Sequence, residues 1–171
     1  KNKIVGRGVT GKYGKPHAET LAIRQAGTSC HGATVFVTLE PCVHFGKTPP
    51  CTDAIIDAGI KRVVCPLADP DERVSGKGFE KLKAANVSLD FIPAAKLWAE
   101  DLTAGFLSRI VRKRPYVTAK LGLSIDGKIA SQHGKSRWIT NELARKHVQL
   151  LRVQNDAVLV GTNTFHLDNP R

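Results

Sequence analysis

The spacing of apolar residues along the chain predicts strands that alternate with helices. The run Ala-Thr-Val-Phe-Val-Thr-Leu over residues 33–39 is rich in β-branched and aromatic residues, which is typical of a strand. Apolar runs over 62–66 and 87–92 predict two more strands. Residues 3–10 predict a further strand, which ends in a glycine-bounded turn at 11–14.

Helical spacing fills the intervals between these strands. Small and apolar residues fall close to one face of a helix that begins at His17 and ends before Gly27. Three further helices are predicted over residues 50–58, 76–85 and 94–112. Strands that alternate with helices indicate the α/β class, so we expect a three-layer α/β/α domain with the starts of its first two helices at one edge of the sheet.

The pattern restarts at Arg114-Pro115. Strands are predicted over 116–123 and 156–160, with a helix capped by Thr140 or Asn141 between them. This is one βαβ unit, and a further helix follows 161–164. We therefore divide the chain into a domain over residues 1–113 and the beginning of a second domain over residues 114–171.

Composition limits the classes of partner. No apolar run approaches the ~20 residues that a membrane helix needs, so we expect no membrane partner. The formal charge of +11 is compatible with nucleic acid or with small phosphorylated ligands. Aromatic residues make up 6% of the chain, which argues against a platform for stacking single-stranded bases.

Two segments carry candidate catalytic chemistry. His17 and Glu19 lie at the predicted start of a helix, and Cys42 and Cys51 flank a loop bounded by prolines. One imidazole and two thiolates leave a fourth tetrahedral position for water, as in catalytic zinc sites. Glu19 is then placed to move a proton from that water to a leaving nitrogen. His-x-Glu followed by Pro-Cys and a second Cys is the pattern of zinc nucleobase deaminases.

Two alternatives stay open on the residues alone. The chain can be a deaminase that acts on a nucleic-acid base, using its basic surface. It can also be a structural zinc module without catalysis, for which His44 or Cys65 would be the fourth ligand. Thiolate ligands favour a reducing compartment, so we expect a cytoplasmic protein.

The motifs together resemble the bifunctional deaminase–reductase family of riboflavin biosynthesis over nearly the whole chain. The deaminase motifs are Pro16-His17-Ala18-Glu19, Thr38-Leu39-Glu40-Pro41-Cys42 and His44-x-Gly46-Lys47-Thr48-Pro49-Pro50-Cys51. The nine-residue step between the two cysteines distinguishes this family from deaminases with Pro-Cys-x2-Cys. The reductase motifs are Arg114-Pro115-Tyr116-Val117-Thr118, Ser124-x-Asp126-Gly127, Ser136-x-Trp138-Ile139-Thr140 and Asp168-Asn169-Pro170-Arg171.

The resemblance implies a cytidine-deaminase-like domain followed by part of a dihydrofolate-reductase-like domain. It implies zinc-dependent hydrolytic deamination of 2,5-diamino-6-ribosylamino-4(3H)-pyrimidinone 5′-phosphate. In a complete chain, NADPH-dependent reduction of 5-amino-6-(5-phosphoribosylamino)uracil would follow. The implied partners are these phosphorylated pyrimidines and further copies of the chain, as a dimer or tetramer, and not nucleic acid.

The resemblance also assigns roles to individual residues. His17, Cys42 and Cys51 hold zinc, and Glu19 is the proton shuttle. The implied substrate contacts are His44, Lys47, Ser136 and Arg152, and the implied NADPH contacts are Gly122, Trp138, Thr164 and Asp168. Lys120 is a further polar candidate in the reductase cleft.

The sequence departs from the family in three places. An N-terminal helix and the start of the first strand, which precede Lys1 in the family, are absent. Asp71 stands where the family often has Asn in an Asp-Pro-Asn turn. The second half of the reductase, with its glycine-rich phosphate loop, does not follow within these residues, so either they are part of a longer natural chain or this chain cannot carry out the reduction. We therefore expect weak binding of NADPH, or none, by this chain.

Overall fold

Three parallel strands form the sheet in the first part of the chain, and β2 lies in the middle. In the computed structural model, which describes residues 3–168, Val63 of β2 lies opposite Val35 of β1 on one side and opposite Leu89 of β3 on the other. The strands are β1 Thr34–Phe36, β2 Arg62–Cys65 and β3 Ser88–Phe91. All three were predicted, although β1 is shorter than the apolar run over 33–39.

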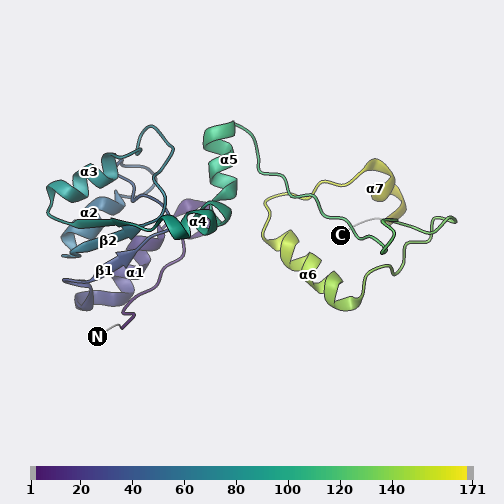
Figure 1. The fold of residues 1–171 in the computed structure, drawn as a ribbon, viewed down its shortest axis with the longest axis horizontal. Coiled ribbons are helices and arrows are strands. Elements are labelled where there is room, and N and C mark those ends of the chain that lie inside the picture. The colour runs from purple at the N-terminus through teal and green to yellow at the C-terminus, as the bar shows by residue number, and fades with distance from the viewer. Residues whose placement is uncertain (1–2, 169–171) are drawn as a thin grey trace. The chain divides into compact units, whose positions relative to one another are not determined.

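The chain divides into two units between Val117 and Thr118 (Figure 1). The helices of the first unit are α1 Ala18–Ala26, α2 Cys51–Asp57, α3 Lys77–Ala84, α4 Lys96–Leu102 and α5 Ala104–Arg112, with short 3₁₀ turns η1 Lys12–Gly14, η2 Gly27–Cys30 and η3 Pro93–Ala95. The described helices of the second unit are α6 Glu142–Val153 and α7 Thr162–Asp168. The α/β class predicted from the alternation is confirmed.

The helices that bear the candidate ligands are neighbours. α1 packs against α2, and α2 packs against α3. Because connections between parallel strands are right-handed, α2 and α3 lie on the same face of the sheet. The first turns of α1 and α2 come together, since His17 and Cys51 at these two helix starts are in contact.

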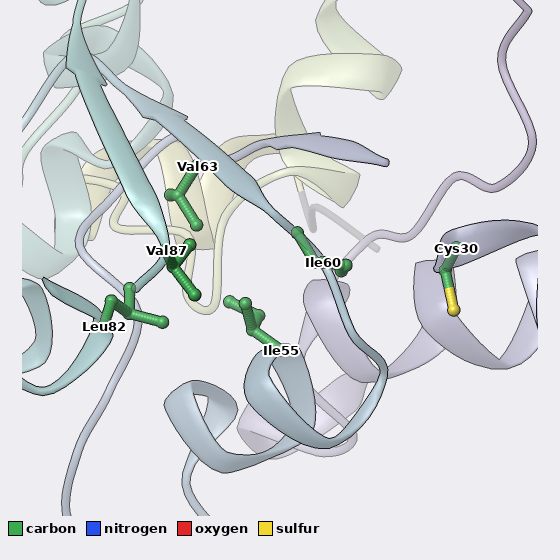
Figure 2. Close-up of a cluster of buried hydrophobic side chains, with 6 residues drawn as sticks. All are labelled: Cys30, Ile55, Ile60, Val63, Leu82 and Val87. Atoms are coloured by element: carbon green, nitrogen blue, oxygen red, sulfur yellow. The ribbon is translucent and has the colours of Figure 1, made fainter. Parts of the chain in front are cut away.

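A buried apolar cluster joins these helices to the sheet (Figure 2). Ile55 of α2, Val63 of β2 and Leu82 of α3 are fully buried. Cys30, Ile60 and Val87 complete the cluster. Burying a side chain of this size stabilises the fold by roughly 1.5–3 kcal/mol, so the cluster fixes α2 relative to the sheet.

Three parts of the prediction differ from the structure. Residues 3–10 are extended but pair with no strand among the described residues; Gly6 and Gly8 instead approach the backbone of α1. The predicted helix over 94–112 is interrupted at Thr103, whose Oγ1 donates to the Ala99 carbonyl at 2.6 Å. Such a bond from a side chain to the backbone competes with helix continuation.

The strands predicted over 116–123 and 156–160 are the third difference. Neither segment is hydrogen-bonded as a strand, and Val117, Leu121 and Leu159 are exposed. One βαβ unit buries too little apolar surface to hold two strands together by itself. The helix between them was predicted correctly, and Asn141 is its N-cap: its Oδ1 accepts from the Ala144 N–H at 2.8 Å.

Among the described residues, no helix combines the length and apolar character needed to span a membrane.

Candidate metal centre

Two helix starts carry the predicted metal ligands. His17 is the N-cap of α1, and its side chain caps no backbone N–H of that helix. Its imidazole is therefore available for another partner. Cys51 is the first residue of α2 and is fully buried. Contact between the two helices brings His17 and Cys51 together, although they are 34 positions apart.

The three predicted ligand atoms form one group. His17 Nδ1 lies 3.2 Å from Cys51 Sγ and 3.5 Å from Cys42 Sγ. All three atoms lie within 4.8 Å of one another. A tetrahedral zinc ion, with Zn–S near 2.3 Å and Zn–N near 2.0–2.1 Å, would place its ligand atoms about 3.5–3.8 Å apart. One imidazole and two thiols at this spacing fit zinc.

The position of Cys42 is fixed by the backbone of α2. The Cys51 N–H donates to Cys42 Sγ at 3.3 Å. The N–H and hydroxyl of Thr52 both donate to the Cys42 carbonyl, at 3.1 and 3.2 Å. Since Thr52 is itself fully buried, the second thiol is held in place by the first turn of the helix that provides the first.

The two thiols share charge unequally. A hydrogen bond with Cys51 lowers the pKa of Cys42 to about 5, and the backbone N–H of Cys51 and the nearby His17 act in the same direction. The same interaction with Cys42 raises the pKa of the Cys51 thiol, and burial adds to the effect. A thiolate is therefore already favoured at Cys42, as a metal ligand requires.

Glu19 lies in the first turn of α1, beside this group. Burial raises the pKa of its carboxyl above the ordinary value, while its own backbone N–H acts in the opposite direction. The charge of Cys42 raises it further, whereas His17 and a hydrogen bond with Cys51 lower it. A carboxyl whose pKa moves toward neutrality is suited to both accept and donate a proton.

The loop between the two thiols carries the other predicted deaminase contacts. The Nδ1 atom of His44 is buried without a hydrogen-bond partner in the described structure. Lys47 is exposed on the same loop. Among the described residues, the group of potential ligands contains neither His44 nor Cys65. Cys65 Sγ donates instead to the Leu67 carbonyl at 3.1 Å, so the geometry offers no fourth protein ligand.

The predicted reductase residues lie in the second unit. The Arg145 guanidinium is 4.2 Å from the Trp138 ring centroid, which is a cation–π contact. Arg152 donates to Gln149 Oε1 at 3.4 Å. No hydrogen bond in the described part of this unit joins any two of Gly122, Ser136, Trp138, Arg152 and Thr164. Asp168 ends α7, and its side chain lies outside the described residues. Their roles stay predictions.

Sequence reasoning missed one residue of the metal loop. Glu40 is 3% exposed, and its carboxylate accepts four backbone N–H groups. The available signal was an acidic residue placed between an apolar strand run and Pro41-Cys42.

Comparisons with known proteins match both parts of the chain. The family described as "Cytidine and deoxycytidylate deaminase zinc-binding region" matches residues 1–67. The family described as "RibD C-terminal domain" matches residues 115–171. The second match begins at residue 115, close to the division between Val117 and Thr118, and the first match lies entirely within the first unit.

Individual relatives extend the similarity over nearly the whole chain. "Riboflavin biosynthesis protein RibD" of Aquifex aeolicus is 51% identical over 168 residues, which are 98% of this chain and 47% of that protein. The Escherichia coli protein of the same name is 46% identical over 98% of this chain and 46% of its own length. The chain thus spans about half the length of the curated relatives it matches.

A solved structure agrees with this assignment. The diaminohydroxyphosphoribosylaminopyrimidine deaminase/5-amino-6-(5-phosphoribosylamino)uracil reductase of Thermotoga maritima superposes with a TM-score of 0.86 at 42% identity. The superposition covers 97% of this chain and 48% of that one. The two proteins are therefore similar in both sequence and fold.

Proposed function

Because the chain belongs to the deaminase–reductase family of riboflavin biosynthesis, we propose that residues 1–113 form a zinc-dependent hydrolytic deaminase. Residues 114–171 are then the beginning of an NADPH-dependent reductase domain. The substrate of the first domain is 2,5-diamino-6-ribosylamino-4(3H)-pyrimidinone 5′-phosphate. The observation that carries the proposal is the group formed by His17, Cys42 and Cys51, with Glu19 beside it.

The three ligands have separate supports. His17 is presented by the start of α1, Cys51 by the start of α2, and Cys42 by the backbone of that same turn. A bound zinc ion would supply Lewis acidity and lower the pKa of a water ligand toward about 7. The chain provides three ligands for such an ion.

Glu19 moves the proton. Hydrolytic deamination adds the oxygen of water to the amino-bearing pyrimidine carbon, breaks the carbon–nitrogen bond and releases ammonia. The Glu19 carboxylate accepts a proton from the attacking water and returns it to the departing nitrogen, so the carboxylate is regenerated in each turnover. Its raised pKa suits a group that must do both.

The loop between the thiols binds the substrate. His44 has a buried ring nitrogen with unused hydrogen-bonding capacity, which a base or ribose group of the substrate would satisfy. Lys47 is exposed on that loop, and its ammonium suits the 5′-phosphate. The net charge of +11 favours the approach of a phosphorylated ligand.

The reductase residues keep the roles that the family implies. Ser136 and Arg152 would contact 5-amino-6-(5-phosphoribosylamino)uracil. Gly122, Trp138, Thr164 and Asp168 would contact NADPH. The protein would act in the cytoplasm as a homo-oligomer, on small molecules rather than on nucleic acid.

Ammonia release by the zinc-loaded chain tests the proposal. The phosphorylated diaminopyrimidine should yield one ammonia per substrate, and removal of zinc should abolish the reaction. Glu19→Gln should retain one zinc per chain while turnover falls by about 10²–10⁴-fold, the range that general acid–base groups supply. Single-stranded oligonucleotides that contain cytosine or adenine are the control. Release of ammonia from these, and not from the pyrimidine, would refute the proposed substrate.

A further inference from the structure

We propose that Glu40 is a positioning residue that locks the loop carrying Cys42 and His44 to the segment 67–79, an inference that rests on the proposed deaminase function. Glu40 does not belong to the group of candidate metal ligands and is almost completely buried. It acts on the loop through hydrogen bonds with backbone N–H groups.

Both oxygens of the Glu40 carboxylate are fully used. Oε2 accepts from the N–H of Asp69 at 3.1 Å and of Gly76 at 3.0 Å. Oε1 accepts from the N–H of Gly78 at 3.0 Å and of Phe79 at 3.3 Å. Three of the four donors belong to the N-cap and first turn of α3. A carboxylate that accepts four backbone N–H groups holds those groups in fixed positions around it.

The backbones on either side of this carboxylate are also in contact. The Glu40 N–H donates to the Leu67 carbonyl at 3.0 Å. A Cβ atom at Gly78 would lie 2.3 Å from the Pro41 carbonyl oxygen, so only glycine lets α3 approach the metal loop this closely. The loop that begins with Pro41-Cys42 is therefore fixed to the segment 67–79 by the carboxylate, by a strand-end hydrogen bond and by this close approach.

The clamped segment includes a turn whose two carboxyl groups, those of Asp69 and Asp71, interact electrostatically with His44. Asp69 Oδ1 accepts from the Asp71 N–H at 2.8 Å, which closes the turn. Burial raises the pKa of the Asp69 carboxyl, against the opposing effects of that N–H and of the nearby His44. The turn and His44 thus lie close together on the two segments that Glu40 joins. A shift of either segment would displace the loop proposed to bind substrate.

Glu40→Gln tests this role with little change in size. One oxygen becomes an NH₂ group, which would face two backbone N–H donors instead of accepting from them. The matched control is Val87→Ala, which shortens a buried core side chain away from the loop. The two variants are compared with the unsubstituted chain under zinc-saturated conditions.

Two readouts distinguish positioning from a general loss of stability. Amide hydrogen exchange at Asp69, Gly76 and Gly78 should accelerate in Glu40→Gln and remain slow in Val87→Ala. KM for the phosphorylated pyrimidine should rise by about 10–100-fold in Glu40→Gln, the range that loss of one hydrogen bond to a charged group corresponds to, with kcat per zinc changing far less. Exchange that stays slow in Glu40→Gln, or an equal rise of KM in Val87→Ala, would overturn the proposal.

Two further measurements cover the remaining cases. If the unsubstituted chain releases no ammonia, the proposed function fails, while the exchange experiment still tests the clamp. If Glu40→Gln does not fold, amide hydrogen exchange at Asp69, Gly76 and Gly78 of the unsubstituted chain tests the clamp instead. The three amides should then exchange as slowly as those of α2, and exchange as fast as that of an unstructured peptide would overturn the clamp.

Discussion

The Nδ1 atom of His17 lies 3.2 Å from the Sγ atom of Cys51. Each residue stands where a helix begins, and neither position is unusual by itself. Their proximity follows from the packing of α1 against α2. With Cys42 Sγ 3.5 Å from the same nitrogen, the arrangement leads to predictions about metal binding that require no substrate.

Removing one ligand should abolish tight zinc binding. Cys51→Ser should weaken zinc affinity by more than about 100-fold, because even partners in the outer shell of a zinc site are worth about 10–100-fold. Competition with a chromophoric chelator measures the affinity. Cys30→Ser is the matched control, since Cys30 is also buried but donates to the Gly27 carbonyl at 2.8 Å. Equal affinities in the two variants would rule out the proposed ligand set.

The metal-free chain should show one reactive thiol. Cys42 has a pKa lowered to about 5 by its hydrogen bond with Cys51, so it is largely a thiolate at pH 7.5. Burial raises the pKa of Cys65 to about 11, so that thiol is protonated and inert. Iodoacetamide followed by peptide mass spectrometry should therefore modify Cys42 first, and added zinc should protect it. Modification of Cys65 at a comparable rate would contradict the assignment.

Local patterns were sufficient to predict the elements that build the metal centre. The apolar runs of β1 to β3 and the helical spacing of α1 to α3 are short-range signals, and Gly27 and Pro50 mark where helices end or begin. The ligands could be predicted because their types and order follow from zinc chemistry.

Features that depend on distant partners could not be predicted in this way. Residues 3–10 alternate like a strand, yet the absence of side chains at Gly6 and Gly8 lets them lie against α1. The four donors to Glu40 come from 29 to 39 residues further along the chain. The strands predicted in the second unit need neighbouring strands to pair with, and the described part of this unit supplies none. Their local pattern is typical of a strand, but the prediction was wrong because strand formation depends on such partners.

Stability should depend on pH through Asp71 and Arg73. The side-chain hydrogen bonds of Arg73, one of them from Nε to Asp71 Oδ1 at 2.9 Å, hold the pKa of the Asp71 carboxyl well below its usual range. A carboxyl with a depressed pKa stabilises the folded state above its unfolded value, about 3.9. This stabilisation is lost as pH falls through the lower, folded pKa.

Urea unfolding of Asp71→Asn, Arg73→Gln and the double variant measures this coupling. Each single substitution should lower the free energy of unfolding at pH 6, and the double variant should lose less than the sum of the two. The coupling should shrink as pH falls from 4 toward 2. A coupling that is independent of pH would show that the carboxylate charge is not its source.

Gly8→Ala should destabilise the chain because the backbone of α1 occupies the space a side chain would need. A Cβ atom at Gly8 would lie 1.9 Å from the Ala18 carbonyl oxygen, which is backbone and cannot rotate away. Overpacking of this kind typically costs 1–3 kcal/mol, and we expect about that loss in the free energy of unfolding. Urea denaturation measures it.

Gly105→Ala is the matched control with the opposite sign. Gly105 lies within α5, and nothing lies within 4 Å of the position its Cβ would occupy. Alanine there should stabilise the chain by about 0.4–1 kcal/mol through the entropy of the unfolded state. A Gly8→Ala chain that is as stable as the unsubstituted chain would mean that residues 3–10 do not lie on α1 as described.

The same substitution at Gly8 should also weaken zinc binding at the metal centre. Ala18 is the first residue of α1 and lies between His17 and Glu19 in the sequence. Relieving the clash requires residues 3–10 or the first turn of α1 to move, and movement of that turn displaces the His17 imidazole from the two thiols. Zinc affinity should therefore fall in Gly8→Ala and remain unchanged in Gly105→Ala, as measured by chelator competition. Unchanged affinity in a destabilised Gly8→Ala chain would show that residues 3–10 yield while the turn stays in place.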